Sequence, residues 1–351
     1  MKKFIGLDAH VQTCTVVVMG PTGRRIKPHV VETKKRELLE LFRSISGEKH
    51  LCIEEGKMSA WLYETLEPEV EQLVVCLPRP RRGNKNDATD AWNLADDLRC
   101  NRIERPVYKS PRKFRLLREA VRAYETTNRD MVRAKARLRS IYLERNVANL
   151  NAKLYDPELA TDWVKKLPSA YRYRAEIFAD QLQAMTAAHE QASVWLELEA
   201  SKVPLVSLLA TAPGIGTIRA AQIVATVITP HRFRTRQQFW SYCGFAIVTH
   251  SSSDWYIDSR GRKVPSKHIL TRGLNRQRNP MLKRVFNGAA KTVTTRMPSH
   301  PLYAEHLRLI EQGTRPNLAR LTIARRIASA VLAMWKNNQR YDPVKHISAN
   351  A

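Results

Sequence analysis

Apolar runs separated by polar breaks dominate the first hundred residues. Residues 4–19 contain two such runs with a turn-like break at Ala9–Thr13, which predicts two strands. Pro21-Thr22-Gly23 predicts a hairpin turn into a third strand at Ile26–Val31. The pattern then alternates between helical and strand-like spacing, with a helix at 34–45, a strand at 51–53, a helix at 60–66, a strand at 73–77 and a helix at 88–99. Paired strands followed by alternating helices and strands predict a mixed α/β domain in the order of an RNase H-like fold over residues 1–107.

The spacing changes to a helical period after this region. Residues 111–200 contain no glycine, and apolar residues such as Leu117, Val121, Leu138 and Ile141 recur at helical intervals. We expect two or three long helices over 108–200, either as a coiled coil that pairs two protomers or as a solvated spacer. Glycine returns in a third, mostly α-helical region at 201–340, and residues 341–351 are expected to form a loose tail.

Charge narrows the class of partner. The chain carries 59 Lys+Arg against 33 Asp+Glu, a formal net charge of +26, while its 43% hydrophobic content is enough for packed cores. A folded protein this basic attracts polyphosphates, so nucleic acid is the expected partner. The odd number of cysteines, with no CxxC pair, argues against a zinc knuckle or a disulfide framework. Without a long apolar stretch, we expect no membrane association and a cytoplasmic, nucleoid-associated location in a prokaryote.

Acidic residues follow the predicted strands and begin the last helix of the first region. Asp8 closes the first strand, where an ordinary turn-starting aspartate is the alternative. Glu54 and Glu55 leave a later apolar strand, and a buried charge is costly there without a partner or a metal. Asp87 and Asp90 are three residues apart and share one helix face, although Asp87 is also a candidate N-cap.

Carboxylates on three successive elements suit phosphodiester chemistry. Two divalent ions about 3.5–4 Å apart can clamp the attacking and leaving oxygens of a displacement. Oxygen ligands favour Mg²⁺, or Mn²⁺, over zinc. The predicted metal ligands are Asp8, Asp87, Asp90 and one of the two neighbouring glutamates, whereas Asp96 and Asp97 are expected to be surface residues.

The third region opens with a glycine motif between two predicted helices. Ala212-Pro213-Gly214-Ile215-Gly216 is typical of a helix-hairpin-helix segment, whose glycines leave backbone N–H groups open to a phosphate. Gly214 and Gly216 are therefore candidate nucleic-acid contacts, with an ordinary turn as the alternative. A serine cluster at 251–253 precedes a basic run that contains three further candidate phosphate contacts, Arg272, Arg276 and Arg278.

Six ordered motifs resemble the DEDD transposases of the insertion-sequence one-ten family, which are related to the Piv DNA invertases. The motifs are Gly6-Leu7-Asp8, an acidic residue before Trp61-Leu62-Tyr63, the Asp87/Asp90 pair, Ala212–Gly216 with Ala220-Ala221, the Gly244 segment, and Arg272-Gly273 leading to Leu282-Lys283. The resemblance spans nearly the whole chain. It implies a RuvC-like domain, a helical coiled-coil insertion and a C-terminal transposase domain with a serine nucleophile.

The resemblance also selects among the candidate site residues. Counted back from Trp61, the family's glutamate falls on Glu55, with Glu54 as the alternative. Counted eight residues on from Gly244, the family's serine falls on Ser252. The resemblance thus implies a catalytic set made of Asp8, Glu55, Asp87, Asp90 and Ser252.

Two departures from the family pattern surround this serine. Phe245-Ala246-Ile247 replaces the usual Leu-x-Pro, and Ser253 stands where the family has glycine. Ser251 and Ser253 are therefore alternative nucleophiles.

The implied function is transposition: DNA strands are cut and rejoined through a covalent phosphoserine intermediate, with Mg²⁺ bound by the carboxylates. Donor and target DNA, a structured guide RNA and further copies of the chain, as a dimer or tetramer, are the implied partners. The alternative is a RuvC-like metal-dependent, structure-specific DNA endonuclease without a covalent intermediate. A third possibility is a nucleic-acid-binding protein without activity.

Overall fold

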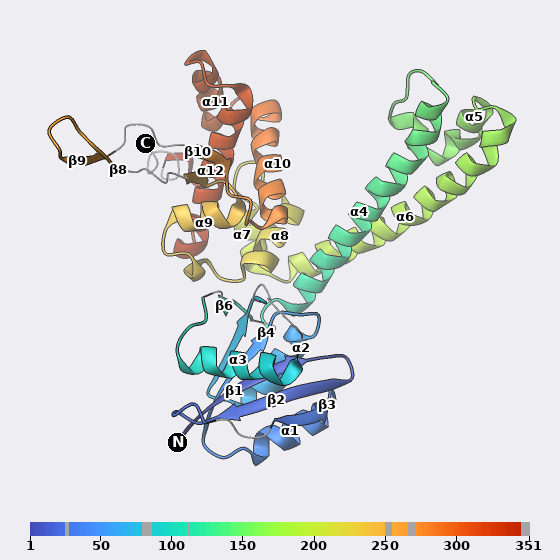
Figure 1. Cartoon of the computed structure of the whole chain (residues 1–351). Helices are drawn as coiled ribbons and strands as arrows, with labels where there is room; N and C mark the ends of the chain where they lie inside the picture. Colours follow the sequence, from blue (N-terminus) through green and yellow to red (C-terminus); the bar gives the residue numbers. More distant parts are fainter. Residues whose placement is uncertain are drawn as a thin grey trace. The chain divides into compact units, whose positions relative to one another are not determined.

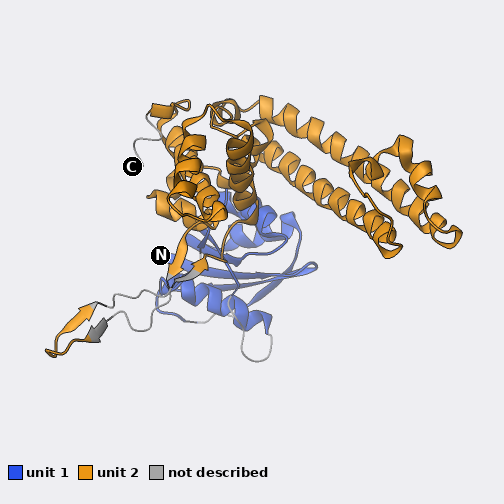
Figure 2. Ribbon diagram, turned by 90° about the horizontal axis from the view of Figure 1, so that it is seen from above, with its two compact units in different colours: residues 1–113 blue, residues 114–351 orange. Residues whose placement is uncertain are grey.

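The computed structural model describes residues 1–344 except 25–27, 79–85, 105, 111, 250–254 and 266–270. It forms two compact units, Met1–Lys113 and Phe114–Ala351, which are coloured separately in Figure 2. No helix among the described residues is both long and apolar enough to cross a membrane.

A six-stranded mixed sheet forms the centre of the first unit, in the strand order β3-β2-β1-β4-β5-β6 (Figure 1). The strands are β1 (Lys2–Ala9), β2 (Thr13–Met19), β3 (His29–Glu32), β4 (Glu48–Glu54), β5 (Gln72–Cys76) and β6 (Pro106–Val107). Strand β1 pairs antiparallel with β2 and parallel with β4. The predicted mixed α/β organisation is confirmed.

Strand alternation assigns each residue of β1 to one face of this sheet. Ile5 and Leu7 pack with helices α1 (Lys35–Ser44) and α2 (Ser59–Leu66) in one core. Phe4 belongs to the opposite core, which contains Ala91 and Ala95 of helix α3 (Asp87–Arg99). On that face a Cβ added at Gly6 would lie 1.9 Å from the Ala91 carbonyl oxygen, so glycine allows α3 to approach the sheet. Asp8 follows Gly6 on the same face.

Helix α3 begins one residue earlier than predicted. The Asn86 side chain caps it, because its Oδ1 accepts hydrogen bonds from the backbone N–H groups of Ala88 and Thr89 at 3.0 and 3.2 Å. The interpretation of Asp87 as an N-cap is therefore wrong: Asp87 is the first helical residue, and its side chain is not needed for the cap.

Later on the same helix, the expectation that Asp97 is a surface residue is also wrong. Asp97 is 7% exposed, and Arg102 Nε lies 3.4 Å from its Oδ1. Arg99 and Arg102 hold the pKa of the neighbouring Asp96 below its usual value, chiefly through their hydrogen bonds to its carboxylate.

Two long helices lie side by side in the second unit (Figure 1). Helix α4 (Arg115–Glu144) and helix α6 (Ser169–Ser201) enclose a small apolar core with α5 (Ala160–Lys165), whose Trp163 Nε1 donates to the Lys153 carbonyl oxygen at 3.0 Å. The long helices were predicted from the glycine-free region. Pairing with another copy as a coiled coil stays a prediction.

The remainder of the second unit is mostly helical, as predicted. It contains α7 (Pro204–Leu209), α8 (Thr217–Val227), α9 (Arg236–Cys243), α10 (Pro280–Arg296), α11 (Pro301–Glu311) and α12 (Pro316–Asn337). Four short strands form two ribbons, which pair β7 (Ile247–Thr249) with β10 (Thr271–Leu274) and β8 (Trp255–Ile257) with β9 (Lys263–Pro265).

One core joins the long helices to the C-terminal helices. Leu117 of α4 and Leu196 of α6 pack in the same cluster as residues of α8, α10 and α12. The predicted boundary near residue 200 therefore lies inside one compact unit. Tyr341, the first residue of the predicted tail, stacks on His300 at 5.8 Å between ring centroids, and burial raises its pKa to about 12. Residues 345–351 lie outside the described part.

Candidate functional site

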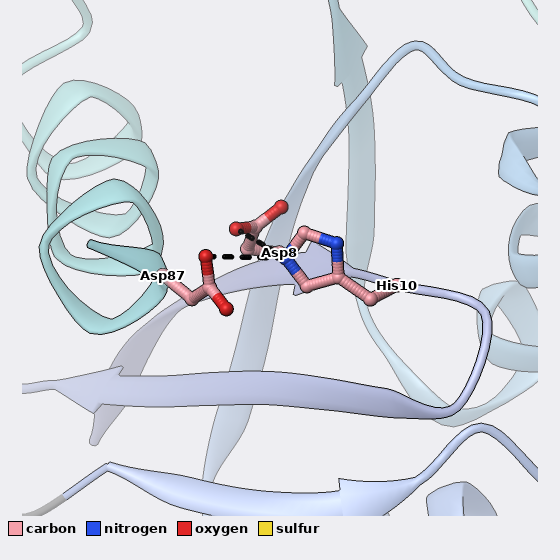
Figure 3. Close-up of side chains that lie close together, drawn as sticks. All are labelled: Asp8, His10 and Asp87. Carbon is pink, nitrogen blue, oxygen red and sulfur yellow. Dashed lines mark ion pairs between the residues drawn. The ribbon is translucent and has the colours of Figure 1, made fainter. Parts of the chain in front are cut away.

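Three side chains meet at the end of β1 and the start of α3. Asp8 is in β1, His10 follows in the turn to β2, and Asp87 begins α3 (Figure 3). His10 Nε2 lies 3.3 Å from Asp8 Oδ2 and 3.2 Å from Asp87 Oδ1. One ligand atom from each residue lies within 4.8 Å of the other two. Such a group is compact enough to surround one cation.

Buried polar atoms of this cluster lack hydrogen bonds within the described part of the protein. Asp8 is 6% exposed, and among the described residues neither its Oδ2 nor His10 Nε2 has a hydrogen-bond partner of adequate geometry. A buried carboxylate oxygen without a partner costs free energy that a bound cation would recover. Two carboxylates and an imidazole can together hold a divalent cation: carboxylates suit Mg²⁺ and Mn²⁺, whereas imidazole suits first-row transition metals. The residues present therefore fit a divalent metal.

The predicted ligand Asp90 lies on α3 one turn after Asp87, and its Oδ2 is buried. Its backbone N–H donates to the Asn86 carbonyl oxygen at 2.9 Å, which fixes it in the first turn. Residues three apart share a helix side, so Asp90 belongs to the same helix side as Asp87. The group of three ligand atoms within 4.8 Å does not include it.

The structure places Glu55 outside the cluster. Lys109 Nζ lies 2.6 Å from Glu55 Oε2 and 2.8 Å from Oε1, and Ser59 Oγ donates to Oε2 at 3.2 Å. Ser59 belongs to α2, which covers the sheet face opposite α3. The Glu55 carboxylate is thus held by a cation and a hydroxyl on the α2 side.

Strand register explains this placement and points to the neighbouring glutamate. In β4, Leu51 and Ile53 pack in the α1/α2 core, so Glu55 continues on that side. Glu54 points to the other face, which is the face of Asp8. The parallel register pairs Leu7 with Ile53, so the next pair along the two strands is Asp8 with Glu54. Of the two glutamates, the alternation brings Glu54 to the carboxylate side.

Three cysteine side chains lie in the strands of this sheet. Burial raises the pKa of Cys14, and the Asp8 charge adds to this effect. Cys52 Sγ lies 3.7 Å from Cys76 Sγ, and this hydrogen bond together with burial raises the Cys52 pKa strongly. Among the described residues, the group of three ligand atoms that lie within 4.8 Å of one another contains no thiol.

His10 was not among the residues predicted from the sequence. The available signal was its spacing, because it follows Asp8 by two residues in Asp8-Ala9-His10. The backbone N–H of His10 donates to the Thr13 carbonyl oxygen at 2.9 Å, and the resulting turn directs the imidazole to the carboxylates.

Two family models match this chain. A transposase model of the DEDD type of IS110 matches residues 5–145, and the model described as "Transposase IS116/IS110/IS902 family" matches residues 206–305. Together they cover more than half of the chain, and the first contains the whole carboxylate cluster. The chain belongs to the IS110 family of transposases.

A curated relative supports the same assignment. This IS110-family chain is 31% identical over 164 residues to the "Insertion element IS110 uncharacterized 43.6 kDa protein" of Streptomyces coelicolor. The aligned part covers 45% of the chain and 36% of that relative. The chain thus spans about a third of the relative's length.

The second family model contains the serine cluster. Ser251, Ser252 and Ser253 lie outside the described residues, as does the side chain of Arg272. The flanking strands are described: Thr249 of β7 pairs with Thr271 of β10. Ser252 as the nucleophile therefore stays a prediction.

The remaining nucleic-acid candidates have different surroundings in this IS110-family chain. Gly214 has a φ of +69°, and a Cβ there would lie 2.5 Å from the Ala289 carbonyl oxygen, so packing against α10 requires this glycine. Gly216 precedes α8, and a Cβ there would meet open space. Arg276 and Arg278 are exposed. Phosphate contacts by these four residues stay predictions.

Proposed function

We propose that this IS110-family chain is a transposase whose carboxylate cluster at the end of β1 acts on DNA phosphodiesters. The observation that carries the proposal is the buried, incompletely satisfied Asp8 carboxylate, held next to Asp87 and His10. A divalent ion bound there would neutralise charge that develops on a phosphate.

Asp8, Asp87 and Asp90 are the proposed metal-holding carboxylates, and Glu54 is the proposed fourth. Glu54 is supported by strand alternation, whereas Glu55 is engaged by Lys109 and Ser59. Asp8 and Asp87 come from two elements, a central strand and a capped helix, which fixes their separation before any ligand arrives. Such preorganisation reduces the reorganisation needed during the reaction.

The proposed nucleophile is Ser252, with Ser251 and Ser253 as alternatives in the same cluster. Attack of the hydroxyl oxygen on phosphorus would form a serine–phosphate ester and break the phosphate bond to one strand end. The released strand end would leave as a hydroxyl, taking up a proton as the serine gives one away. The ester would conserve the bond for rejoining. Family membership and the position of the serines support this step.

Donor and target DNA, a structured guide RNA and a second copy of the chain are the proposed partners. The net charge of +26 supports polyanion binding. Large apolar side chains stand exposed on the long helices, namely Leu116, Val132 and Leu143 on α4 and Tyr173, Ile177, Val194 and Leu198 on α6. Exposed apolar side chains on these helices support contact with another copy through this region.

Covalent trapping tests the proposal. Incubation with Mg²⁺ and end-labelled DNA should give a DNA adduct that survives denaturing electrophoresis, and Ser252→Ala should abolish the adduct while DNA affinity stays nearly unchanged. Loss of the adduct with Ser251→Ala or Ser253→Ala instead would move the nucleophile within the cluster.

A metal-dependent endonuclease that hydrolyses DNA is the second candidate. It is favoured by the fact that the Asp8–His10–Asp87 cluster is built entirely within the first unit. Cleavage that persists without any adduct, and after replacement of all three serines, would establish the hydrolytic endonuclease and exclude the covalent serine mechanism.

A further inference from the structure

A basic groove of about 840 Å³ runs between α10 and the first turns of α12 in the second unit. We call it the α10–α12 groove. Five of its lining residues are cationic: Arg278, Lys283, Arg284, Lys291 and Arg320. Its other lining residues are apolar side chains, a glycine and two asparagines, with no carboxylate among the described residues that line it. The lining therefore has one sign of charge.

Most of this charge is not neutralised within the described structure. Arg284 pairs with Glu125 of α4. The Nε of Arg320 is buried without a hydrogen-bond partner among the described residues. Burial lowers the pKa of Lys283, and the charge of Arg278 contributes to this shift. Lys283 and Arg320 are half-buried, whereas Arg278, Arg284 and Lys291 are exposed. Like charges that are close together repel one another, and an anion between them would relieve this repulsion.

The start of α12 adds to this positive potential. The helix begins at Pro316, next to the lining residues Asn317 and Leu318, and Arg315 at its N-cap makes no side-chain capping hydrogen bond. Pro316 has no N–H, and the N–H groups of Leu318 and Ala319 donate to the Arg315 carbonyl oxygen at 2.8 and 3.0 Å. The contribution of this helix start is therefore its dipole, which favours an anion there. The two asparagine side chains of the lining, Asn287 and Asn317, can donate hydrogen bonds to phosphate oxygens.

Chain connectivity ties the groove to the serine cluster. Leu274, the last residue of β10, lines the groove and pairs with Ile247 of β7. Ser252 follows Ile247 by five residues, which span at most about 18 Å when fully extended. The serine cluster is thus close in sequence to a strand whose pairing partner lines the groove.

We propose that the α10–α12 groove holds the phosphodiester backbone of the DNA strand that is cut, close to the scissile phosphate. The groove would recognise phosphate rather than base sequence, because its lining offers charges in place of a matched set of base-edge contacts. The identity of the bound strand rests on the function proposed above.

Binding measured without chemistry tests this proposal. The Ser252→Ala chain provides the background, and a labelled DNA oligonucleotide of mixed sequence and an RNA of the same sequence provide the probes. Adding Lys283→Ala/Arg320→Ala should weaken DNA binding roughly tenfold and lower the slope of log affinity against log salt by about 1.4, as two lost phosphate contacts on a single strand would. The control pair Lys35→Ala/Arg139→Ala removes the same formal charge from exposed positions and should leave both quantities nearly unchanged.

Lys291→Glu is a second groove variant that should leave the fold intact, because Lys291 is exposed. Reversal of the charge at this position should still weaken DNA binding. The proposal is overturned if groove variants bind DNA like the control pair, or if their loss is confined to RNA. Adduct formation in the serine-intact chain is scored separately. If the groove variants lose DNA affinity, the role of the groove in binding DNA is supported. If the serine variants still form adducts, the serine mechanism is refuted, whatever the groove variants show.

Discussion

The end of β1 and the α10–α12 groove concentrate charge of opposite sign. The first gathers carboxylates around a buried aspartate, and the second gathers arginines and lysines without a carboxylate in its described lining. Like charges repel in both regions, most strongly at the buried Asp8, whereas three of the five groove cations are exposed. The difference indicates two ligands: a small cation for the carboxylates and a polyanion for the groove.

The two regions also differ in how their side chains are fixed. The carboxylates are set by strand register and a helix cap, so a change of one residue decides which face a side chain occupies. The groove residues are long side chains on two helices, which tolerate small displacements. We therefore expect single substitutions to act sharply at the carboxylates and gradually in the groove.

The largest effect is expected for Asp8→Asn. Loss of one buried metal ligand should reduce cleavage by ~10³-fold or more, because several kcal/mol of charge stabilisation are lost. The same change removes a buried charge, so the metal-free chain should keep or raise its melting temperature. Steady-state cleavage and thermal unfolding with and without Mg²⁺ measure both. A large loss of stability in the metal-free variant would contradict a site that is strained without its ligand.

Substitution of the two neighbouring glutamates tests which of them is the metal ligand. Glu54→Gln should reduce cleavage by about 100-fold with little change in unfolding free energy, as expected for a metal ligand. Glu55→Gln should instead destabilise the first unit by about 1–3 kcal/mol, because Lys109 is left partly buried without its partner. Parallel denaturation and cleavage assays distinguish them, and the reversed pattern would restore Glu55 as the ligand.

A smaller effect is expected at His10. An imidazole ligand strengthens binding of Mn²⁺ more than that of Mg²⁺. His10→Ala should therefore weaken Mn²⁺ binding by roughly tenfold and change Mg²⁺ binding much less. Calorimetric titration of both ions into wild type and variant measures this. Equal losses for the two ions would assign His10 a positioning role without direct ligation.

The fold was predictable where hydrophobic spacing is regular. The order of strands and helices up to Arg99 and the long helices after residue 114 followed from that spacing. Strand β6 was not predicted, because its two residues, Pro106 and Val107, carry no periodicity. A core shared by the long helices and the C-terminal helices is a long-range contact that local patterns do not report.

Candidate site residues could be recognised in the sequence only where they stand at the end or the start of a predicted element. Asp8 and Asp87, which the structure brings together with His10, were candidates because a strand end and a helix start mark them. The resemblance favoured Glu55 over Glu54, whereas strand alternation in the structure favours Glu54. The apolar run alone does not distinguish them, because β4 is buried on both faces and gives no alternation to read. The placement of His10 depends on a turn whose geometry the sequence leaves open.

The proposed chemistry depends on the claim that the cluster of Asp8, His10 and Asp87 binds a divalent metal. Crystals of the wild-type chain soaked in Mn²⁺ and measured for anomalous scattering test it directly. A bound Mn²⁺ should give an anomalous peak about 2.0–2.4 Å from oxygens of Asp8 and Asp87, with Glu54 closer to it than Glu55. Density without a peak at this cluster, at a Mn²⁺ concentration that supports cleavage, would contradict the claim.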